Sequence, residues 1–399
     1  MNIFVINSGS SSIKYQLFRM PLENPLCSGL AERIGLKDGI ITHKTFIEGK
    51  EHQVKREVDL PDHEAGLLEV TRLLTDPENG VIRDPGEIDA VGHRVVHGGE
   101  DFASTTFITE EVKLKVKSLF ALAPLHNPPN YLGIEVAEKI FANAKQVAVF
   151  DTAFHQTMPE KAFRFALPRK LYQQLGIRAY GFHGTSHKYV SEKAMEYLRN
   201  PSAKIITIHL GNGCSMAAVN AGRSVDTSMG FGPNSGLVMG TRSGDIDPSI
   251  IFHLVNQCGY SLDQVNTLLN KESGMIGLTG FSDMRDIIHA IEQGNEEAKL
   301  AYEIYAYRIK KYIGSLSAIM NGLDALVFTA GVGENDSRIR ELVCQDMEFF
   351  GIKIDMEKNR ERSRTIRDIS IDDAKVKILV IPTNEELEIV KQCYALMNG

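Results

Sequence analysis

Short apolar runs that end in small polar residues recur along the chain and predict buried strands. The first run is residues 3–6 (IFVI), and the polar segment 7–12 (NSGSSS) follows it. Ile13, Tyr15 and Leu17 then alternate with polar residues. A continuous apolar run followed by an alternating one predicts two strands joined in a hairpin.

The same pattern recurs in the second half of the chain. Residues 205–210 (IITIHL) lead into the turn 211–215 (GNGCS) and the apolar run 216–219 (MAAV). One copy in each half predicts two domains of similar fold. A turn of small residues leaves backbone N–H groups available to an anion, so we interpret both hairpins as candidate phosphate-binding turns.

The other apolar runs and the segments between them predict an α/β fold. Further strands are predicted at residues 147–150, 325–328 and 376–381, and helices at residues 110–120, 298–319 and 386–397. Each of these strands ends in polar or glycine-rich residues, and open α/β sheets bind ligands at the carboxyl ends of their strands. We expect a domain boundary just after Phe150.

Composition and charge argue against several classes of protein. The 399 residues are 43% hydrophobic, enough for a sizeable core in each domain. With 44 Lys and Arg against 51 Asp and Glu, the net charge is −7, and no basic block suggests nucleic acid or an anionic membrane as partner. No apolar stretch approaches the ~18 residues of a membrane span, and no signal peptide is expected. None of the five cysteines forms a Cys-x-x-Cys pair, which argues against a disulfide framework and predicts a cytoplasmic protein.

Several familiar catalytic signatures are absent from the sequence. There is no P-loop, no Gly-x-Gly-x-x-Gly fingerprint, no protein-kinase loop and no Gly-x-Ser-x-Gly elbow. The pairs His93/His97 and His183/His187 have the spacing of zinc ligands, but they lack the glutamate of the His-Glu-x-x-His motif, so metal binding by these pairs is not favoured.

Polar residues embedded in glycine and proline form five candidate loops. They lie at residues 92–100, 123–130, 151–155, 181–187 and 240–245, and contain Arg94, His126, Asp151, His183 and Arg242. Alone, an exposed Arg is usually solvated and a loop His often caps backbone. Together they indicate anion handling, because Arg and His donate hydrogen bonds to phosphate and carboxylate oxygens.

The loops and hairpins together resemble a known family. The motifs GHRVVHGGE, APLHNPPN, VFDTAFHQTMP, YGFHGTSH, HLGNG, VDTSMGF, GLVMGTRSGDIDP, FTAGVGEN and PTNEE are similar to those of the acetokinases, within the sugar-kinase, chaperone and actin superfamily. The resemblance implies reversible phosphoryl transfer from ATP to acetate, giving acetyl phosphate and ADP, with Mg²⁺ (or Mn²⁺ as a substitute). It also implies a homodimer of chains with two ribonuclease-H-like domains and an interdomain active-site cleft. The domains would span residues 1–150, completed by a helix at 386–399, and residues 151–385.

The resemblance also assigns roles to residues. Arg94 and Arg242 should bind the carboxylate and the transferring phosphoryl group, and His183, assisted by His126, should stabilise the transition state. Asp151 is the family's acid/base or positioning carboxylate. The implied metal ligands are Asn7 and Glu385, and the implied acetate pocket is Arg94, Val96, Leu125, Phe182 and Pro233. The implied nucleotide site is Lys14, His209, Leu210, Gly211, Asn212, Gly213, Asp283, Met284, Arg285, Gly331, Val332, Gly333, Glu334 and Asn335.

The acceptor argues for a positioning role of Asp151. A carboxylate substrate with a pKa near ~4 is already ionised at pH 7, so it needs no base. The difficulty is to bring two anions together, which Arg94, Arg242, His183 and Mg²⁺ would overcome. We therefore expect Asp151 to orient an arginine or the water shell of the metal.

Three alternatives to phosphoryl transfer onto acetate remain open: transfer onto propionate, a non-catalytic nucleotide switch and an acyl-phosphate hydrolase. Residues 232–235 are Gly-Pro-Asn-Ser where the family pattern has Thr-Pro-Leu-Glu, so preference between acetate, which Val96 favours, and propionate is in doubt. One methylene is worth only ~1–3 kcal/mol in such a pocket. A nucleotide switch would not need both arginines and both histidines, and an acyl-phosphate hydrolase would not need an apolar pocket.

Overall fold

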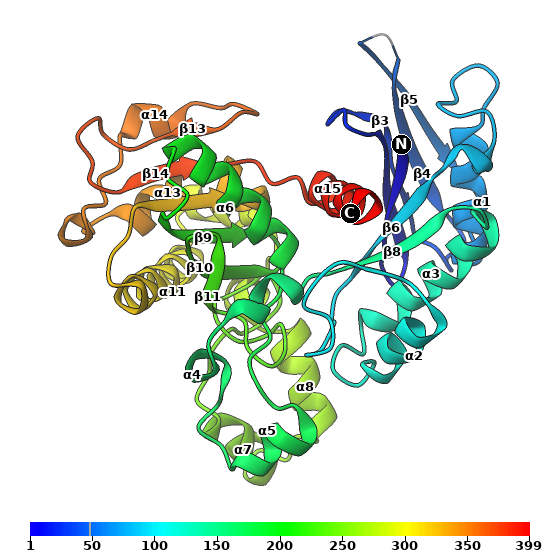
Figure 1. The fold of residues 1–399 in the computed structure, drawn as a ribbon. Coiled ribbons are helices and arrows are strands. Elements are labelled where there is room, and N and C mark those ends of the chain that lie inside the picture. Colours follow the sequence, from blue (N-terminus) through cyan, green and yellow to red (C-terminus); the bar gives the residue numbers. More distant parts are fainter. Residues whose placement is uncertain (48) are drawn as a thin grey trace. The chain divides into compact units, whose positions relative to one another are not determined.

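The computed structural model describes residues 1–47 and 49–399, which divide into two compact units. The first unit is Met1–Ala153 with Asn384–Gly399, and the second is Phe154–Thr383 (Figure 1). Each unit contains one mixed sheet and several helices, so the predicted α/β fold class is confirmed. Among the described residues, we find no helix both long and apolar enough to cross a membrane.

The first unit is built on an eight-stranded sheet in the order β5-β4-β3-β2-β1-β6-β8-β7. Its strands are β1 (Asn2–Ser8), β2 (Ser12–Arg19), β3 (Pro25–Glu32), β4 (Ile40–Ile47), β5 (Lys50–Glu57), β6 (Ala90–Val95), β7 (Thr106–Phe107) and β8 (Lys145–Phe150). The predicted N-terminal hairpin is confirmed, because β1 and β2 pair antiparallel. Strands β1, β6 and β8 are parallel neighbours, so their carboxyl ends lie along one edge.

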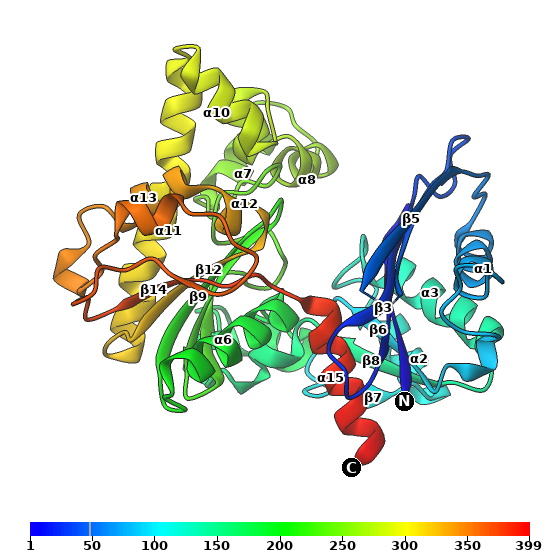
Figure 2. The same ribbon diagram turned by 90° about the horizontal axis from the view of Figure 1, so that it is seen from above.

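Helices cover both faces of this sheet. They are α1 (His63–Leu74), α2 (Glu110–Ser118), α3 (Asn127–Ile140) and α15 (Glu385–Asn398), with a 3₁₀ turn, η1 (Pro85–Glu87). Figures 1 and 2 show α1 and α3 on one face of the sheet and α15 on the other. Helix α15 begins at the strand-end edge, where Asn384 Oδ1 caps it by accepting from Leu387 N–H at 3.0 Å.

The second unit repeats the design with a six-stranded sheet in the order β11-β10-β9-β12-β14-β13. Its strands are β9 (Lys204–Leu210), β10 (Cys214–Asn220), β11 (Arg223–Thr227), β12 (Ala325–Thr329), β13 (Arg367–Asp368) and β14 (Lys377–Val380). The predicted second hairpin is confirmed by the antiparallel pairing of β9 and β10. Strands β9, β12 and β14 are parallel, so the ends of β9 and β12 present their loops at the same edge.

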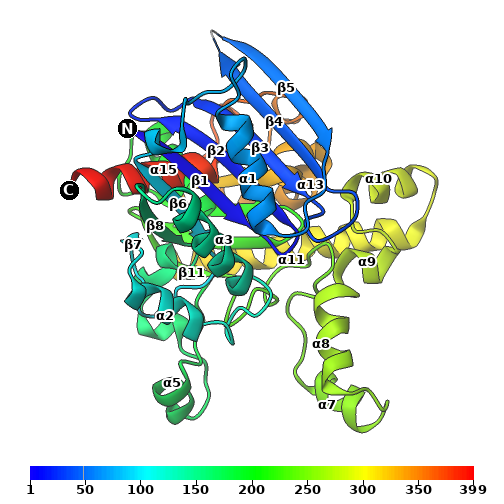
Figure 3. The same ribbon diagram turned by 90° about the vertical axis from the view of Figure 1, so that its right-hand side faces the viewer.

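Helices of the second unit pack on its sheet and extend beyond it. Helix α6 contacts β9 and β12, the long helix α11 contacts β9 and β10, and α7 lies against α8 in a separate layer (Figure 3). The helices are α4 (Glu160–Phe163), α5 (Arg169–Leu175), α6 (Gly184–Leu198), α7 (Ser249–Asn256), α8 (Leu262–Lys271), α9 (Gly274–Thr279), α10 (Met284–Glu292), α11 (Glu296–Met320), α12 (Ala330–Asn335), α13 (Ser337–Cys344) and α14 (Met356–Arg360), with 3₁₀ turns η2 (Ala153–Thr157) and η3 (Glu348–Phe350).

Candidate active site

Arg94 and Asp151 lie together at the edge of the first unit's sheet where β1, β6 and β8 end. Arg94 lies near the end of β6 and Asp151 directly follows β8, so the pairing of these parallel strands brings the two side chains together. Asp151 Oδ2 accepts hydrogen bonds from Arg94 Nε at 2.9 Å and Nη2 at 2.6 Å. Glu385 Oε2, at the start of α15, lies 3.8 Å from Arg94 Nε.

The surroundings of Arg94 keep its guanidinium charged. Burial by itself lowers the pKa of Arg94, but the negative charges of Asp151 and Glu385 outweigh burial and raise the pKa overall. A cation that is only 19% exposed and held by carboxylates is suited to binding a small anion.

Lys14 and Glu386 form an ion pair near the same edge. Lys14 Nζ lies 2.6 Å from Glu386 Oε1; the lysine side chain is 51% exposed and the glutamate 8% exposed. Lys14, a predicted nucleotide ligand, is thus paired within its own unit to a residue that the sequence reasoning did not select. Asn7, a predicted metal ligand, lies opposite Lys14 in the β1–β2 hairpin.

Two buried asparagines of α3 hold the loop that follows Arg94. Asn127 Oδ1 accepts from His97 N–H and its Nδ2 donates to the His97 carbonyl, both at 3.0 Å. Asn130 Oδ1 accepts from Val96 N–H at 3.0 Å and its Nδ2 donates to the Ser8 carbonyl at 2.7 Å. The sequence reasoning did not select these asparagines, although their position in the NPPN segment beside His126 was the available signal.

The four predicted apolar pocket residues are divided between the units. Val96 is half-buried and Leu125 is 59% exposed in the first unit. Phe182 is buried and Pro233 is half-buried in the second. Of these residues, Pro233 contacts a predicted catalytic residue, since its carbonyl accepts a hydrogen bond from Arg242 Nη1 at 3.2 Å.

His183 is held in a defined orientation at the start of α6. Its backbone lies in the left-handed region with φ of 54°, where a non-glycine residue is strained. Its Nδ1 is 2.9 Å from Ser215 Oγ, and its ring stacks on His209 with 4.4 Å between centroids. A Cβ built on Gly213 would lie 3.4 Å from His183 Cε1 and 3.8 Å from Arg242 Nη1. Gly213 of the turn predicted to bind phosphate, His183 and Arg242 are therefore brought together.

Two further histidines are buried behind His183. His187 Nε2 lies 2.7 Å from Ser215 Oγ and its Nδ1 lies 2.7 Å from Thr207 Oγ1. Burial lowers the pKa of His187 well below its usual range and that of His155 to about 4. Both are neutral at pH 7, and the two ring nitrogens of His187 are engaged in hydrogen bonds within the fold.

The loop that departs from the family pattern makes its own hydrogen bonds. Ser235 Oγ accepts from Gly230 N–H at 2.8 Å, and Asn234 Oδ1 accepts from Ser243 Oγ at 3.3 Å. Asn234 and Ser235 therefore close the loop locally around Pro233. Burial lowers the pKa of Arg242, which still remains a cation at neutral pH.

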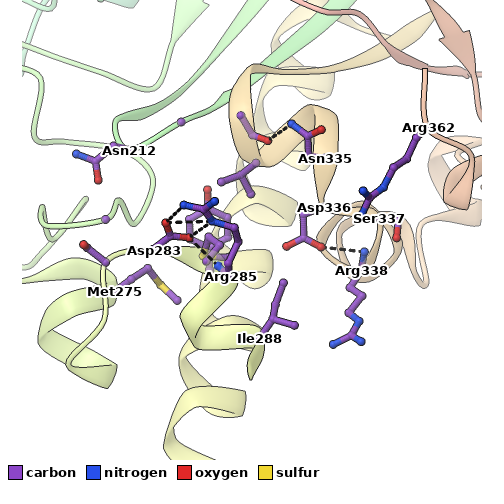
Figure 4. A pocket seen from close by; sticks show the side chains of 17 residues that line it. Asn212, Met275, Asp283, Arg285, Ile288, Asn335, Asp336, Ser337, Arg338 and Arg362 are labelled. Carbon is purple, nitrogen blue, oxygen red and sulfur yellow. Dashed lines mark hydrogen bonds and ion pairs between the residues drawn. The ribbon is translucent and has the colours of Figure 1, made fainter. Parts of the chain in front are cut away.

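A cavity of about 760 Å³ opens beside Gly211 and Asn212, in the turn after β9 of the second unit (Figure 4). Figure 4 shows Asp283 and Arg285 interacting on one wall, with Asp336 and Arg338 on another. Of the predicted nucleotide residues, those that line the cavity are Gly211, Asn212, Asp283, Met284, Arg285, Gly331, Val332 and Asn335. Glu334 does not line the cavity; its Oε1 accepts hydrogen bonds from Ala330 N–H and Thr383 N–H and so connects α12 to the segment after β14.

Several lining residues were not selected from the sequence. They are Gly240, Met275, Ser282, Ile288, Tyr305, Asp336, Ser337, Arg338 and Arg362. Asp336 follows the GVGEN segment and caps α13 by accepting from Arg338 N–H, so adjacency was its signal. Gly240 lies in the 240–245 loop, which the sequence analysis marked for Arg242. The others come from α9, the segment between α9 and α10, α10, α11, α13 and the segment after α14, and no local motif marks them.

Known proteins resemble this chain over its whole length. The chain matches the acetokinase family over residues 2–391. An acetate kinase of Flavobacterium johnsoniae is 58% identical over 399 residues, which cover 100% of both chains. The crystal structure of Porphyromonas gingivalis acetate kinase superimposes with a TM-score of 0.93 at 45% identity, covering 99% of each chain. A propionate kinase structure from Francisella tularensis superimposes with a TM-score of 0.91 at 41% identity, covering 98% of each.

Proposed function

The chain belongs to the acetokinase family, and we propose that it transfers the terminal phosphoryl group of ATP reversibly to acetate, giving acetyl phosphate and ADP. It is an enzyme of the kinase class. The observation that best supports this acceptor is the Arg94–Asp151 contact, because it presents an oriented guanidinium to a small carboxylate. A hydroxyl acceptor would have no need of this cation.

Arg94 and Arg242 divide the handling of negative charge. Arg94 binds the acetate carboxylate, and Asp151 keeps the guanidinium in its plane without removing a proton from the substrate. Arg242 and His183, both near Gly213, bind the transferring phosphoryl group as its charge redistributes, and Arg242, whose Nη1 donates to the carbonyl of Pro233, also binds the acetate carboxylate. We also propose that His126, the residue before α3, assists His183 in stabilising the transition state.

The cavity of the second unit holds ATP. The turn Gly211–Gly213 at the end of β9 offers backbone N–H groups to the phosphates. Met284 and Ile288 offer apolar surface to the base, and Asp283 and Asn335 offer polar groups to the nucleoside. We also propose Lys14, which forms an ion pair with Glu386, as a ligand of the ATP phosphates.

Magnesium is the metal that the donor set fits. Among the described residues, no three His, Cys, Asp or Glu side chains group into a self-sufficient metal site. Mg²⁺ needs no such cage, since it usually binds one or two protein oxygens together with waters and substrate phosphates. Asn7 and Glu385, both oxygen donors, would hold it. When bound, Mg²⁺ neutralises the charge of the ATP phosphates.

A propionate kinase is the second candidate. The fold is shared with a propionate kinase at 41% identity, and Asn234 and Ser235 depart from the family pattern beside Pro233. The discriminating experiment measures ADP release from Mg·ATP with acetate, with propionate and without acid, and traps the acyl phosphate with hydroxylamine. Acetate preference supports the first proposal, and propionate preference the second. Release that is indifferent to both acids overturns both in favour of a hydrolase or switch.

The assembly and cellular location are also proposals. We propose that the chain forms a homodimer, as the resemblance to the acetokinases implies. We also propose that it works in the cytoplasm, which is consistent with its five unpaired cysteines, of which four are buried. Analytical ultracentrifugation of the purified chain tests the dimer, since a sedimenting species at monomer mass over the micromolar range contradicts it.

A further inference from the structure

The loop that carries Arg242 is closed at its base by Gly236 and Asp245. Gly236 N–H donates to Asp245 Oδ1 at 2.7 Å, and Asp245 N–H donates to the Gly236 carbonyl at 3.1 Å. Gly236 has φ of +97°, and a Cβ there would lie 2.6 Å from the Ser228 carbonyl oxygen. Only glycine suits this position, so its peptide is a fixed point of the loop.

Helix α11 holds this base from outside the loop. Tyr312 Oη donates to Asp245 Oδ2 at 2.7 Å. Arg308 Nη1 donates to the Gly236 carbonyl at 2.9 Å and to the Asp245 carbonyl at 3.2 Å. Burial and the hydrogen bond to Asp245 raise the pKa of Tyr312, so its hydroxyl remains a donor at neutral pH.

Gly236 in turn controls the group against which Arg242 rests. Arg242 Nη1 donates to the carbonyl of Pro233, which belongs to the segment that ends at Gly236. The backbone of Arg242 is held by other hydrogen bonds that do not involve Gly236. The Arg242 carbonyl accepts from Met239 N–H, and Ser243 N–H donates to the Leu269 carbonyl. The base of the loop therefore sets the orientation of the guanidinium rather than the position of the backbone.

We infer that Asp245, Arg308 and Tyr312 are positioning residues that orient Arg242 for the acceptor and the transferring phosphoryl group. The inference rests on the proposed function, in which Arg242 binds these anions. Asp245 is 46% exposed and Arg308 22% exposed, so loss of their interaction costs little folding stability. A small displacement of a substrate-binding group, in contrast, can lower a rate by ~10²-fold.

The experiment compares Asp245→Ala, Asp245→Asn and Tyr312→Phe in the full chain. We expect Asp245→Ala to lower kcat by roughly tenfold or more and to raise KM for acetate, with KM for ATP unchanged. Asp245→Asn keeps an acceptor for Gly236 N–H and should recover most of the lost kcat. Tyr307→Phe, at a 66% exposed tyrosine of the same helix, is the control and should match the wild type.

A second tyrosine of α11 is expected to affect KM for ATP rather than KM for acetate. Tyr302 Oη donates to Asp336 Oδ2 at 2.6 Å, and Asp336 lines the nucleotide cavity. Tyr302→Phe should therefore raise KM for ATP and leave KM for acetate unchanged. A merely structural role of Tyr312 would give both variants the same profile.

Three outcomes separate the inference from the proposed function. Wild-type protein without acid-dependent ADP release overturns the proposed function itself. Active wild type with an Asp245→Ala variant of unchanged kcat and acetate KM overturns the inference. If Asp245→Ala does not fold, Tyr312→Phe decides, and an equal rise in both KM values for that variant also overturns it.

Discussion

Asp151 Oδ2 receives two hydrogen bonds from one guanidinium, at 2.9 Å from Arg94 Nε and 2.6 Å from Nη2. A contact of two donors on one oxygen fixes the plane of the guanidinium, and the buried carboxylate compensates its charge. In the proposed function, Asp151 thereby prepares Arg94 for an anion that is already ionised, so no proton needs to move.

The first prediction concerns this contact. Asp151→Asn removes the charge but keeps the shape, so Arg94 loses its orienting partner. We expect kcat/KM for acetate to fall by about 10²-fold, the cost of a misplaced binding group, while ATP binding is retained. Steady-state kinetics with both substrates measure this. Glu138→Gln, which removes a partner of Lys113 near the C-terminal end of α3, is the matched control. Near-normal turnover of Asp151→Asn would contradict the positioning role.

The second prediction concerns the metal. Glu385→Gln replaces the carboxylate proposed to bind Mg²⁺ by a neutral amide oxygen, so the Mg²⁺ concentration for half-maximal activity should rise by roughly tenfold or more. A titration of Mg²⁺ at constant free ATP measures the shift. Glu386→Gln, one residue along α15, is the comparison, because its carboxylate pairs with Lys14. Equal shifts in both variants would remove Glu385 from the metal site.

The third prediction concerns acid stability. Burial lowers the pKa of His93 to about 4. Between pH 6.5 and 4 the unfolded chain therefore binds a proton at this position that the folded chain does not. Stability contributed by the neutral form is present above pH 6.5 and falls by about 1.4 kcal/mol per pH unit as the pH drops toward 4.

Urea unfolding at pH 7.5, 6.5 and 5.5 tests this dependence. His93→Gln should lower stability at every pH, because His93 Nε2 lies 2.8 Å from Gln146 Oε1, but its free energy of unfolding should fall less steeply below pH 6.5. His52→Gln, on exposed strand β5, should run parallel to the wild type. If the free energy of unfolding depended on pH equally in all three proteins, folding would not change the pKa of His93.

Local pattern was sufficient for the strands and helices that were predicted and for part of the site. The two hairpins and the helix α11 follow from hydrophobic periodicity, and Gly211 and Asn212 follow from the turn after β9. Contacts between distant segments were not predictable. Tyr312 and Asp245 are 67 residues apart, and no local motif at either residue predicts their hydrogen bond.

The same limit applies to charged residues whose partners come from tertiary packing. Lys14 lies in the first hairpin and Glu386 in the last helix, so only the folded first unit reveals their ion pair. The lining of the cavity by Arg338 and Arg362 likewise depends on how α13 and the segment after α14 approach the end of β12. Local composition marks both arginines only as surface charge.

The fourth prediction concerns the close approach of Gly240 to Asn212, in the turn after β9. Gly240 N–H donates to the Asn212 carbonyl at 3.0 Å, and a Cβ on Gly240 would overlap the Asn212 side-chain oxygen. That side chain is able to move, so Gly240→Ala should fold, but Asn212 would be displaced within the cavity.

We expect Gly240→Ala to raise KM for ATP about tenfold, equivalent to one hydrogen bond of ~1.4 kcal/mol, with little change in KM for acetate. Gly314→Ala is the control, because Gly314 lies within α11 and a Cβ there meets only Phe350 Cζ at 3.9 Å. That variant should keep wild-type kinetics and gain about 0.5–1 kcal/mol in stability from the better helix former. If Gly240→Ala bound ATP as tightly as the control does, Asn212 would have no part in holding the nucleotide.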